Sequence, residues 1–271
     1  MNPTPRRSEE EIEAVPAPAD EEPPVAAGPV PDRIFAEPRS RIDDFHFGAE
    51  TAAVFDDMLD RSVPYYGEIQ RMIGELAAEF AAENTNIVDL GCSTGTTILQ
   101  IAQALPPRRA VRFIGLDSSP EMLAIARKKI DAAHIDQEFE LIETDMNQGV
   151  RVENASVVVL ALTLQFVRPL YRQRLIRSIR EGLTDNGCVI LVEKVLGENS
   201  TFNRMFIKNY YKMKKAHGYS ENEIAQKREA LENVLVPYRL EENKELLTSE
   251  GFSHVDVFFK WYNFCALVGM K

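Results

Sequence analysis

The stretch "NIVDLGCSTG", residues 86–95, joins an apolar run to the start of a helix through a turn with two glycines. The run at 86–91 predicts a buried strand, and the pattern that follows predicts a helix over 94–105. Gly91 and Gly95 permit a tight turn that brings the backbone close to a ligand at the helix N-terminus. The turn lacks the Gly-Lys-Ser/Thr of a P-loop and the third glycine of a dinucleotide site. Close packing of the strand against the helix is the alternative reason for these glycines.

Strands and helices alternate after this turn. Further apolar strands are expected at 111–117, 139–145, 156–166 and 188–195, and helices at 119–133 and 168–183. Continuously apolar strands separated by helices predict a parallel sheet that is covered on both faces. The last segment, 256–270, has the pattern of two strands with a tight connection, which predicts an antiparallel pair. The expected fold class is therefore α/β and Rossmann-like, with a mostly parallel sheet and an antiparallel C-terminal hairpin.

The first 40 residues differ in composition from the rest of the chain. They hold nine of the fifteen prolines, together with acidic clusters and few large apolar side chains. Such a segment cannot bury enough surface to offset the entropy of ordering. We therefore expect a disordered tail over 1–42 and one catalytic domain over 43–271. Helices within 200–250 exceed what the sheet requires, so the segment 197–236 is expected to form a helical lid or a dimer surface.

Composition excludes several classes of protein. The net charge of −11 argues against a protein that grips nucleic acid over a broad surface. Cys92, Cys188 and Cys265 are odd in number and far apart, which indicates reduced thiols and neither a disulfide framework nor a metal site. No apolar run approaches the roughly 20 residues of a membrane span, and no secretory signal is recognisable. These features predict a cytoplasmic protein that binds no metal, no membrane and no nucleic acid directly.

Two carboxylates follow the glycine turn at the ends of the next two strands. Asp117 lies roughly 20 residues beyond the turn, where a carboxylate can accept both ribose hydroxyls of a nucleoside. Capping of the helix that starts near Ser119 is the alternative role for Asp117. Asp145 ends the third strand, within reach of an adenine amino group. This arrangement, with Gly, Asp and Asp at three consecutive strand ends, resembles that of the class I S-adenosylmethionine (SAM) enzymes. The resemblance implies a sheet of seven strands.

The segment "SENEIAQKREALENVL", residues 220–235, predicts a helix that begins with a Ser-x-x-Glu capping box. At about 100° per residue, Ile224 and Leu231 fall on one face together with Arg228. A guanidinium on that face either meets an anion in a pocket, because it stays charged when desolvated, or extends along the packed face to water. Lys227, at the edge of the face, is expected to reach water.

Beyond the superfamily, the chain from about Asp43 to Lys271 resembles the carboxy-S-adenosyl-L-methionine synthases. The resemblance is carried by the segments "AAVFDDMLDRSVPYY", "VDLGCSTG", "LDSSPEML", "ENASVVVLALTLQF", "GYSENEIAQKREALENVL" and "YNFCALVGMK". It implies a homodimeric transferase in which the SAM methyl group takes up the carboxyl group lost by prephenate. The products are carboxy-SAM and phenylpyruvate, and carboxy-SAM feeds the modification of the wobble uridine in tRNA.

The same resemblance assigns roles to individual residues. Gly91, Cys92 and Ser93 would line the amino-acid end of the cofactor, Asp117 and Ser118 the ribose, Asp145 and Met146 the adenine, and Tyr66 would contact the nucleoside. Arg228 would bind the new carboxylate and is the one catalytic residue expected. Cys92 is expected to contribute its backbone and not to act as a nucleophile. Two positions depart from the family, since Ala161 replaces an asparagine that contacts the cofactor and Ser118 stands where asparagine is frequent.

Two other classes of function stay open. An ordinary SAM-dependent methyltransferase acting on a small molecule needs no cation near the methyl group, since no carboxylate forms. A SAM-binding scaffold without turnover would keep the carboxylates at the strand ends. If a carboxyl donor binds, its carboxylates need cationic partners, for which Arg204 and the basic run 208–215 are candidates. No protein general base can be assigned, and His217 is expected to face solvent.

Overall fold

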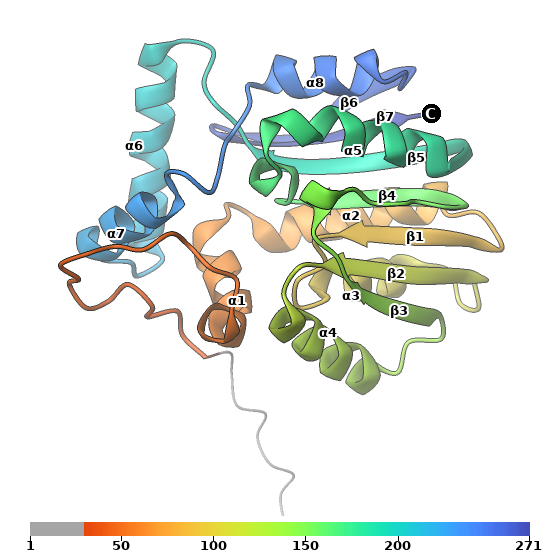
Figure 1. Cartoon of the computed structure of the whole chain (residues 1–271), viewed down its shortest axis with the longest axis horizontal. Coiled ribbons are helices and arrows are strands. Elements are labelled where there is room, and N and C mark those ends of the chain that lie inside the picture. Colours follow the sequence, from red (N-terminus) through yellow and green to blue (C-terminus); the bar gives the residue numbers. More distant parts are fainter. Residues whose placement is uncertain (1–29) are drawn as a thin grey trace, which may run out of the picture.

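The computed structural model describes residues 30–271, in which helices cover both faces of one seven-stranded sheet (Figure 1). The strands are β1 (Thr85–Leu90), β2 (Val111–Asp117), β3 (Glu138–Glu143), β4 (Ala155–Ala161), β5 (Leu183–Lys194), β6 (His254–Trp261) and β7 (Phe264–Met270). The helices are α1 (Ala49–Ser62), α2 (Tyr66–Phe80), α3 (Thr96–Ala104), α4 (Pro120–Ala133), α5 (Pro169–Gly182), α6 (Ser200–Ala216), α7 (Glu221–Leu231) and α8 (Leu240–Ser249), with single 3₁₀ turns η1 (Met146–Gln148) and η2 (Leu164–Phe166).

The sheet has the strand order β3-β2-β1-β4-β5-β7-β6. Neighbours from β3 through β5 pair in parallel, whereas β7 pairs antiparallel with both β5 and β6. The predicted sheet, mostly parallel with an antiparallel C-terminal hairpin, is therefore confirmed. The order reverses between β1 and β4. In open α/β sheets, ligands bind at such a switch point, beyond the carboxyl ends of the strands.

The central strand β4 shows why an unbroken apolar run forms a strand here. Val157 and Leu160 are fully buried, because β1 and β5 flank the strand and helices cover both of its faces. The predicted strand at 156–166 is too long. The chain leaves the sheet after Ala161, where Leu162 adopts a φ of 63° and η2 follows.

Two hydrophobic layers hold the sheet between its helices. On one face, α2 and α3 bury Ile73 and Ile101 against side chains such as Phe113 of β2. On the other face, α5 and α8 bury Ile176 and Leu247. Both layers follow the apolar pattern that predicted a parallel sheet covered on two sides.

The segment before α1 corrects the expected domain boundary. Residues 1–29 of the predicted tail lie outside the described residues, but residues 30–42 pack onto the domain. Asp32 is 2% exposed and Phe35 is 6% exposed. The backbone N–H of Phe45 donates to the carbonyl of Ala230 at the end of α7, 2.9 Å away. Figure 1 shows this segment running beside α7 and α1. A few buried side chains are enough to hold this segment on the domain. The proline-rich composition of the segment does not reveal such an anchor.

Helices α6 and α7 lie beyond the carboxyl ends of the strands, with α1 beside them (Figure 1). They fall within the segment 197–236, whose role as a lid or a dimer surface stays a prediction. The capping box expected at the start of α7 is present in both directions between Ser220 and Glu223. No helix within residues 30–271 is long and apolar enough to cross a membrane.

Candidate functional site

A cavity of about 230 Å³ lies at the carboxyl ends of the strands. Its wall includes the turn after β1, the ends of β2, β4 and β5, both 3₁₀ turns, and parts of α1, α6 and α7. The predicted site residues that line it are Tyr66, Gly91, Ser93, Asp117, Ser118, Asp145 and Met146. Cys92 and Arg228 do not line it. The structure therefore brings together side chains from distant parts of the sequence at the place that the switch point predicts.

The glycine turn is tight for a reason that the structure makes visible. Gly91 and Gly95 have φ values of 78° and 79°, and Ser93 between them has 46°. A Cβ atom on Gly91 would lie 2.4 Å from the Thr163 hydroxyl oxygen, which is too close for any real contact. The absence of a side chain at Gly91 thus lets the turn pack directly against Thr163, and both residues line the cavity. The turn suits a ligand that the backbone approaches closely.

Asp117 holds this turn to the start of α4. Its carboxylate accepts from the backbone N–H of Ser93 at 2.9 Å and from that of Ser119 at 2.9 Å. Burial raises the pKa of Asp117, and these backbone bonds oppose the shift. The helix cap itself is provided by the Ser119 hydroxyl, which accepts from Met122 N–H at 3.1 Å. Asp117 therefore lines the cavity and does not act only as the helix cap.

Asp145 lies two residues beyond β3, because the strand ends at Glu143 and not at 145 as predicted. Its carboxylate accepts from the backbone N–H and the side-chain amide of Asn147, both at 2.9 Å. The backbone bond from Asn147 is the main cause of the lowered pKa of Asp145. Asp145 is therefore a fixed acceptor at the cavity wall, next to the buried side chain of Met146.

Tyr66 begins α2 directly after Tyr65, which adopts the left-handed conformation with a φ of 53°. This bend directs the chain so that the Tyr66 side chain lines the cavity. Burial raises the pKa of its phenol, and the nearby carboxylate of Asp56 adds to the shift. The phenol is therefore a neutral hydrogen-bonding group, suited to a contact with a polar ligand.

Cys92 points away from the cavity. Its side chain is 2% exposed and packs in the core close to Gly115, and burial raises the pKa of its thiol. Its backbone N–H donates to the carbonyl of Leu116 at 3.0 Å. A nucleophilic role is thereby disfavoured, as expected. The Cys92 backbone was predicted to contact a cofactor, but in the structure its N–H is already paired with the carbonyl of Leu116 at the end of β2.

Asp89 is a buried carboxyl that is not among the predicted site residues. It precedes the glycine turn by two positions on β1, and both of its carboxylate oxygens are buried without a hydrogen-bond partner among the described residues. Burial, assisted by the charge of Asp117, raises the pKa of Asp89 to about 8. Asp89 does not itself line the cavity, but a buried carboxyl without a partner directly behind the turn is unusual and marks this place in the fold.

Arg228 does not lie where the helix pattern placed it. Its side chain is exposed, whereas Lys227 is 6% exposed and lines the cavity. The prediction that Lys227 reaches water is therefore wrong, and so is the prediction that Arg228 lies on the buried face. The reason is the segment before α1, which covers α7 from the other side: the Gln226 amide donates to the carbonyls of Phe35 at 2.9 Å and Glu37 at 3.0 Å.

Three lysine ammonium groups gather at one end of the cavity. Lys194 at the end of β5 and Lys227 on α7 line it, and Lys214 of α6 is buried close by. The Lys214 ammonium lies 5.7 Å from the ring centre of Tyr210 and 4.8 Å from that of Tyr219. Lys214 belongs to the basic run 208–215 that the sequence singled out, but Lys194 and Lys227 were missed. In the sequence, Lys194 is a lysine at the end of a predicted strand, and Lys227 lies at the edge of the predicted packed face of its helix.

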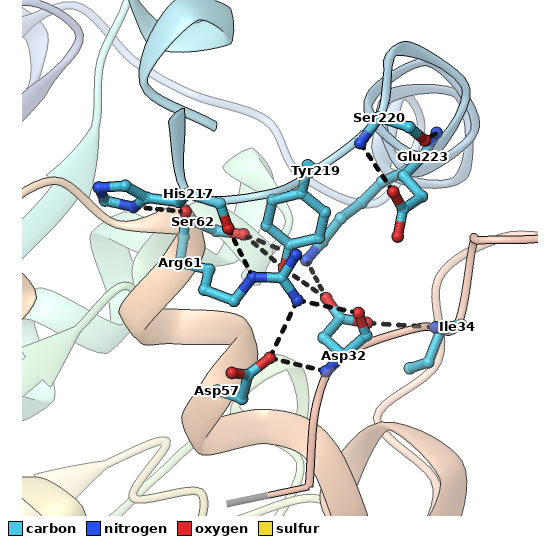
Figure 2. A network of polar contacts seen from close by, with 10 residues as sticks. Asp32, Ile34, Asp57, Arg61, Ser62, His217, Tyr219, Ser220 and Glu223 are labelled. Carbon is cyan, nitrogen blue, oxygen red and sulfur yellow. Dashed lines mark hydrogen bonds and ion pairs between the residues drawn. The ribbon is translucent and has the colours of Figure 1, made fainter. Parts of the chain in front are cut away.

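Lys227 is paired with a carboxylate from the N-terminal segment. Its ammonium lies 3.3 Å from Asp32 Oδ2, and the hydroxyl of Tyr219 donates to the same oxygen at 2.5 Å. Figure 2 shows Asp32 next to Tyr219 and Arg61, and the Arg61 guanidinium also donates to the Asp32 carbonyl at 3.1 Å. This network fixes the segment before α1 over the lysine end of the cavity.

Ala161 ends β4 and lines the cavity between these two ends. Its methyl group offers no hydrogen bond there, so the departure from the family pattern falls within the site. His217 is exposed, as expected, and its backbone carbonyl accepts from Arg61 at 2.9 Å. Arg204, the other cation considered for a donor, does not line the cavity. Within residues 30–271, no group of three or more His, Cys, Asp or Glu side chains could hold a metal ion.

Comparisons with known proteins agree with this fold. A family model described as "Methyltransferase domain" matches residues 87–187. An O-methyltransferase family protein from Burkholderia thailandensis shares the fold with a TM-score of 0.56 at 16% identity, over 82% of this chain and 60% of that one. The S-adenosylmethionine-dependent methyltransferase SibL has a TM-score of 0.54, also at 16% identity, over 81% of this chain and 58% of that one. At such identity the likeness shows the fold alone.

The curated relatives are much closer in sequence. The carboxy-S-adenosyl-L-methionine synthase of Methylococcus capsulatus is 59% identical over 240 residues, which cover 89% of this chain and 99% of the relative. The protein of the same name from Desulfotalea psychrophila is 42% identical over 240 residues, 89% of this chain and 97% of the relative. Both names denote transferases that use SAM, and the fold and the glycine turn fit SAM binding. The chain therefore belongs to the carboxy-S-adenosyl-L-methionine synthase family, within the class I SAM-methyltransferase superfamily.

Proposed function

We propose that this transferase converts SAM and prephenate to carboxy-SAM and phenylpyruvate, with release of water. The observation that carries the proposal is the 59% identity to a carboxy-S-adenosyl-L-methionine synthase over 99% of its length. Prephenate as the donor comes from the family resemblance of the sequence. The carboxyl group lost by the donor forms the new bond to carbon, and the donor hydroxyl leaves as water with a proton from the methyl group.

The residues of the cavity would hold SAM by their ordinary chemistry. Asp117 and Asp145 offer carboxylate oxygens for hydroxyl and amino groups, and the turn at Gly91 and Ser93 lets the backbone approach the amino-acid end. Bound SAM supplies a methyl group that its sulfonium makes acidic.

The other contribution of the chain is a dry cavity. Phe47 packs edge-on against Phe166 with ring centres 5.0 Å apart, and against Phe55 at 6.2 Å. All three rings line the cavity. An aromatic wall excludes water and strengthens electrostatic interactions with a bound anion. Holding the two substrates together in such a place supplies proximity without any protein general base.

One experiment tests the proposal directly. The purified protein is incubated with SAM and prephenate, and the nucleoside product is weighed by mass spectrometry. A mass gain of one CO₂ relative to SAM, with phenylpyruvate formed in equal amount, supports carboxyl transfer. S-adenosylhomocysteine formed only with a methyl acceptor would support an ordinary methyltransferase instead. SAM binding without any product would support a scaffold.

The family resemblance further implies a homodimer, and we include this in the proposal. Phe202 and Met205 on α6 are exposed by 49% and 52%, and apolar side chains at this density favour an interface. Because Arg228 is exposed in the single chain, its proposed contact with the product carboxylate needs a second copy or a movement of α7. Sedimentation velocity tests the dimer. The resemblance also places the product upstream of wobble-uridine modification of tRNA in the cytoplasm.

A further inference from the structure

The lysine end of the cavity has more positive charge than the surrounding protein neutralises. Among the described residues, the Lys227 ammonium has Asp32 within ion-pair distance, but Lys194 and Lys214 have no carboxylate within 4.0 Å. The contacts of these two ammonium groups are with aromatic rings, and Lys194 lies 5.0 Å from the ring centre of Tyr210. Burying an ammonium group without an anion is unfavourable, because the protein replaces water poorly.

The position of these lysines separates them from the cofactor residues. The residues expected to hold SAM follow β1, β2 and β3, which lie on one side of the sheet centre. Lys194 ends β5, on the other side of β4, and α6 and α7 bring Lys214 and Lys227 to it. The cavity thus has an acidic half, with Asp117 and Asp145, and a basic half. A cation and an anion could bind side by side in it.

We propose that Lys194 and Lys227 bind the carboxylates of a small dicarboxylic acid, the group donor, and that buried Lys214 reinforces their positive field. Lys227 is paired with Asp32, whereas Lys194 and Lys214 have no carboxylate within ion-pair distance among the described residues, and two unpaired ammonium groups match a dianion. The inference rests on the proposed function for the identity of the donor. It adds the residues that select a dicarboxylic acid and the half of the cavity in which it lies.

Two alternative roles for these lysines predict different results. If the lysines only stabilise the fold through their contacts with Tyr210 and Tyr219, their replacement lowers stability and leaves donor binding unchanged. If they hold the carboxylate of SAM itself, their replacement weakens SAM binding. Replacement by Met keeps the length of the apolar stem and removes a buried charge, so the fold should not lose stability through desolvation.

The test compares Lys194→Met and Lys214→Met with Lys212→Met, an exposed lysine on the same helix as Lys214. Titration calorimetry measures the binding of SAM, of glutarate as an inert dicarboxylate and of butyrate as its monocarboxylate control. Steady-state kinetics with prephenate give the donor KM and kcat. We expect Lys194→Met to raise the glutarate Kd and the donor KM about tenfold or more, since it removes a buried charge partner.

Lys214→Met should raise both constants by a smaller factor, and Lys214→Arg should restore them because the charge is kept. SAM affinity should stay unchanged in every variant, and Lys212→Met should behave like the wild type. Donor and glutarate constants that are unchanged in Lys194→Met overturn the inference, and so does an equal loss of SAM affinity. If glutarate binding depends on the lysines but no carboxy-SAM forms, the dicarboxylate site stands and the proposed reaction fails. If carboxy-SAM forms but the lysine variants keep the wild-type KM, the proposed reaction stands and the dicarboxylate site fails.

Discussion

The ammonium group of Lys227 lies 3.3 Å from the carboxylate of Asp32, and both side chains are buried. This ion pair joins α7 to a segment nearly 200 residues earlier in the chain and closes the basic half of the cavity. The Tyr219 hydroxyl bonds to the same carboxylate. When one partner of such a pair is removed, the other is left as a buried charge without compensation.

Asp32→Asn should therefore destabilise the protein by about 3 kcal/mol, the usual cost of breaking a buried pair. Urea unfolding, followed by the fluorescence of the single tryptophan, Trp261, measures the change. The double variant Asp32→Asn/Lys227→Met should lose less than the sum of the two single variants, because neither charge is then left alone. Asp43→Asn removes an exposed carboxylate paired with Arg41 and serves as the control. Equal losses in both Asp variants would contradict a special role for the buried pair.

The local parts of this site could be predicted from the sequence. Gly91, Asp117 and Asp145 lie at or just beyond the ends of strands, and parallel strands bring their carboxyl ends to one edge of the sheet. Their positions therefore follow from the strand pattern and the order of the chain, even though the third strand ends two residues early.

The basic half of the cavity could not be predicted in the same way. Which face of α7 is buried depends on the segment 30–45, and residues 30–42 of it were predicted to belong to a disordered tail. Once Gln226 and Ala230 bind its backbone, the buried face turns away from Arg228 and toward Lys227. A helical pattern alone cannot reveal a neighbour so far away in the chain.

Gly91→Ala should abolish measurable SAM binding. The added Cβ would lie 2.4 Å from the Thr163 hydroxyl, and the φ of 78° adds about 1 kcal/mol of backbone strain for any L-residue. The turn must then shift where it faces the cavity. Equilibrium dialysis with labelled SAM measures the loss. Gly48→Ala is the matched control, because a Cβ atom at Gly48 would meet nothing within 4 Å and the φ there is −80°. Wild-type affinity in Gly91→Ala would show that the turn does not approach the cofactor.

Donor binding should weaken as the pH rises. Burial lowers the pKa of Lys194 to about 8 and that of Lys214 to about 7, where the neighbouring ammonium groups add to the effect. Each lysine is charged below its pKa, so the charges of Lys194 and Lys214 are present at pH 6 and mostly lost by pH 9. The other titratable or charged groups around these lysines are Asp32, Asp57, Arg61, Tyr210, Tyr219, Glu223 and Lys227. Burial raises the pKa of both tyrosines, so neither titrates in this range.

The measurement is the glutarate Kd between pH 6 and pH 9, which should rise about tenfold across the range. In Lys214→Met the dependence near pH 7 should disappear, leaving the part that belongs to Lys194. A Kd that does not change with pH in the wild type would mean that these lysines keep their charge throughout, or do not face the ligand.

Arg228→Ala should leave SAM affinity and fold stability close to those of the wild type. The side chain is exposed and lines no part of the cavity in the single chain, and surface substitutions of this kind change stability by less than about 0.5 kcal/mol. The family resemblance adds that the variant should lose the preference of the wild type for carboxy-SAM over SAM. Competition between the two nucleosides measures this preference. Equal affinities of the wild type for both would remove Arg228 from the site.

Ala161→Asn should strengthen SAM binding. Ala161 lines the cavity at the end of β4, next to the turn that carries Gly91, and the family resemblance places a cofactor-contacting asparagine there. One added hydrogen bond is worth about 1 kcal/mol, so the SAM Kd should fall roughly fivefold. Ala161→Val is the control, since it adds volume without a polar group and should not improve binding. If Ala161→Asn weakens binding while Ala161→Val is tolerated, the cavity has already adapted to the small residue, and the missing contact is supplied by another group in this chain.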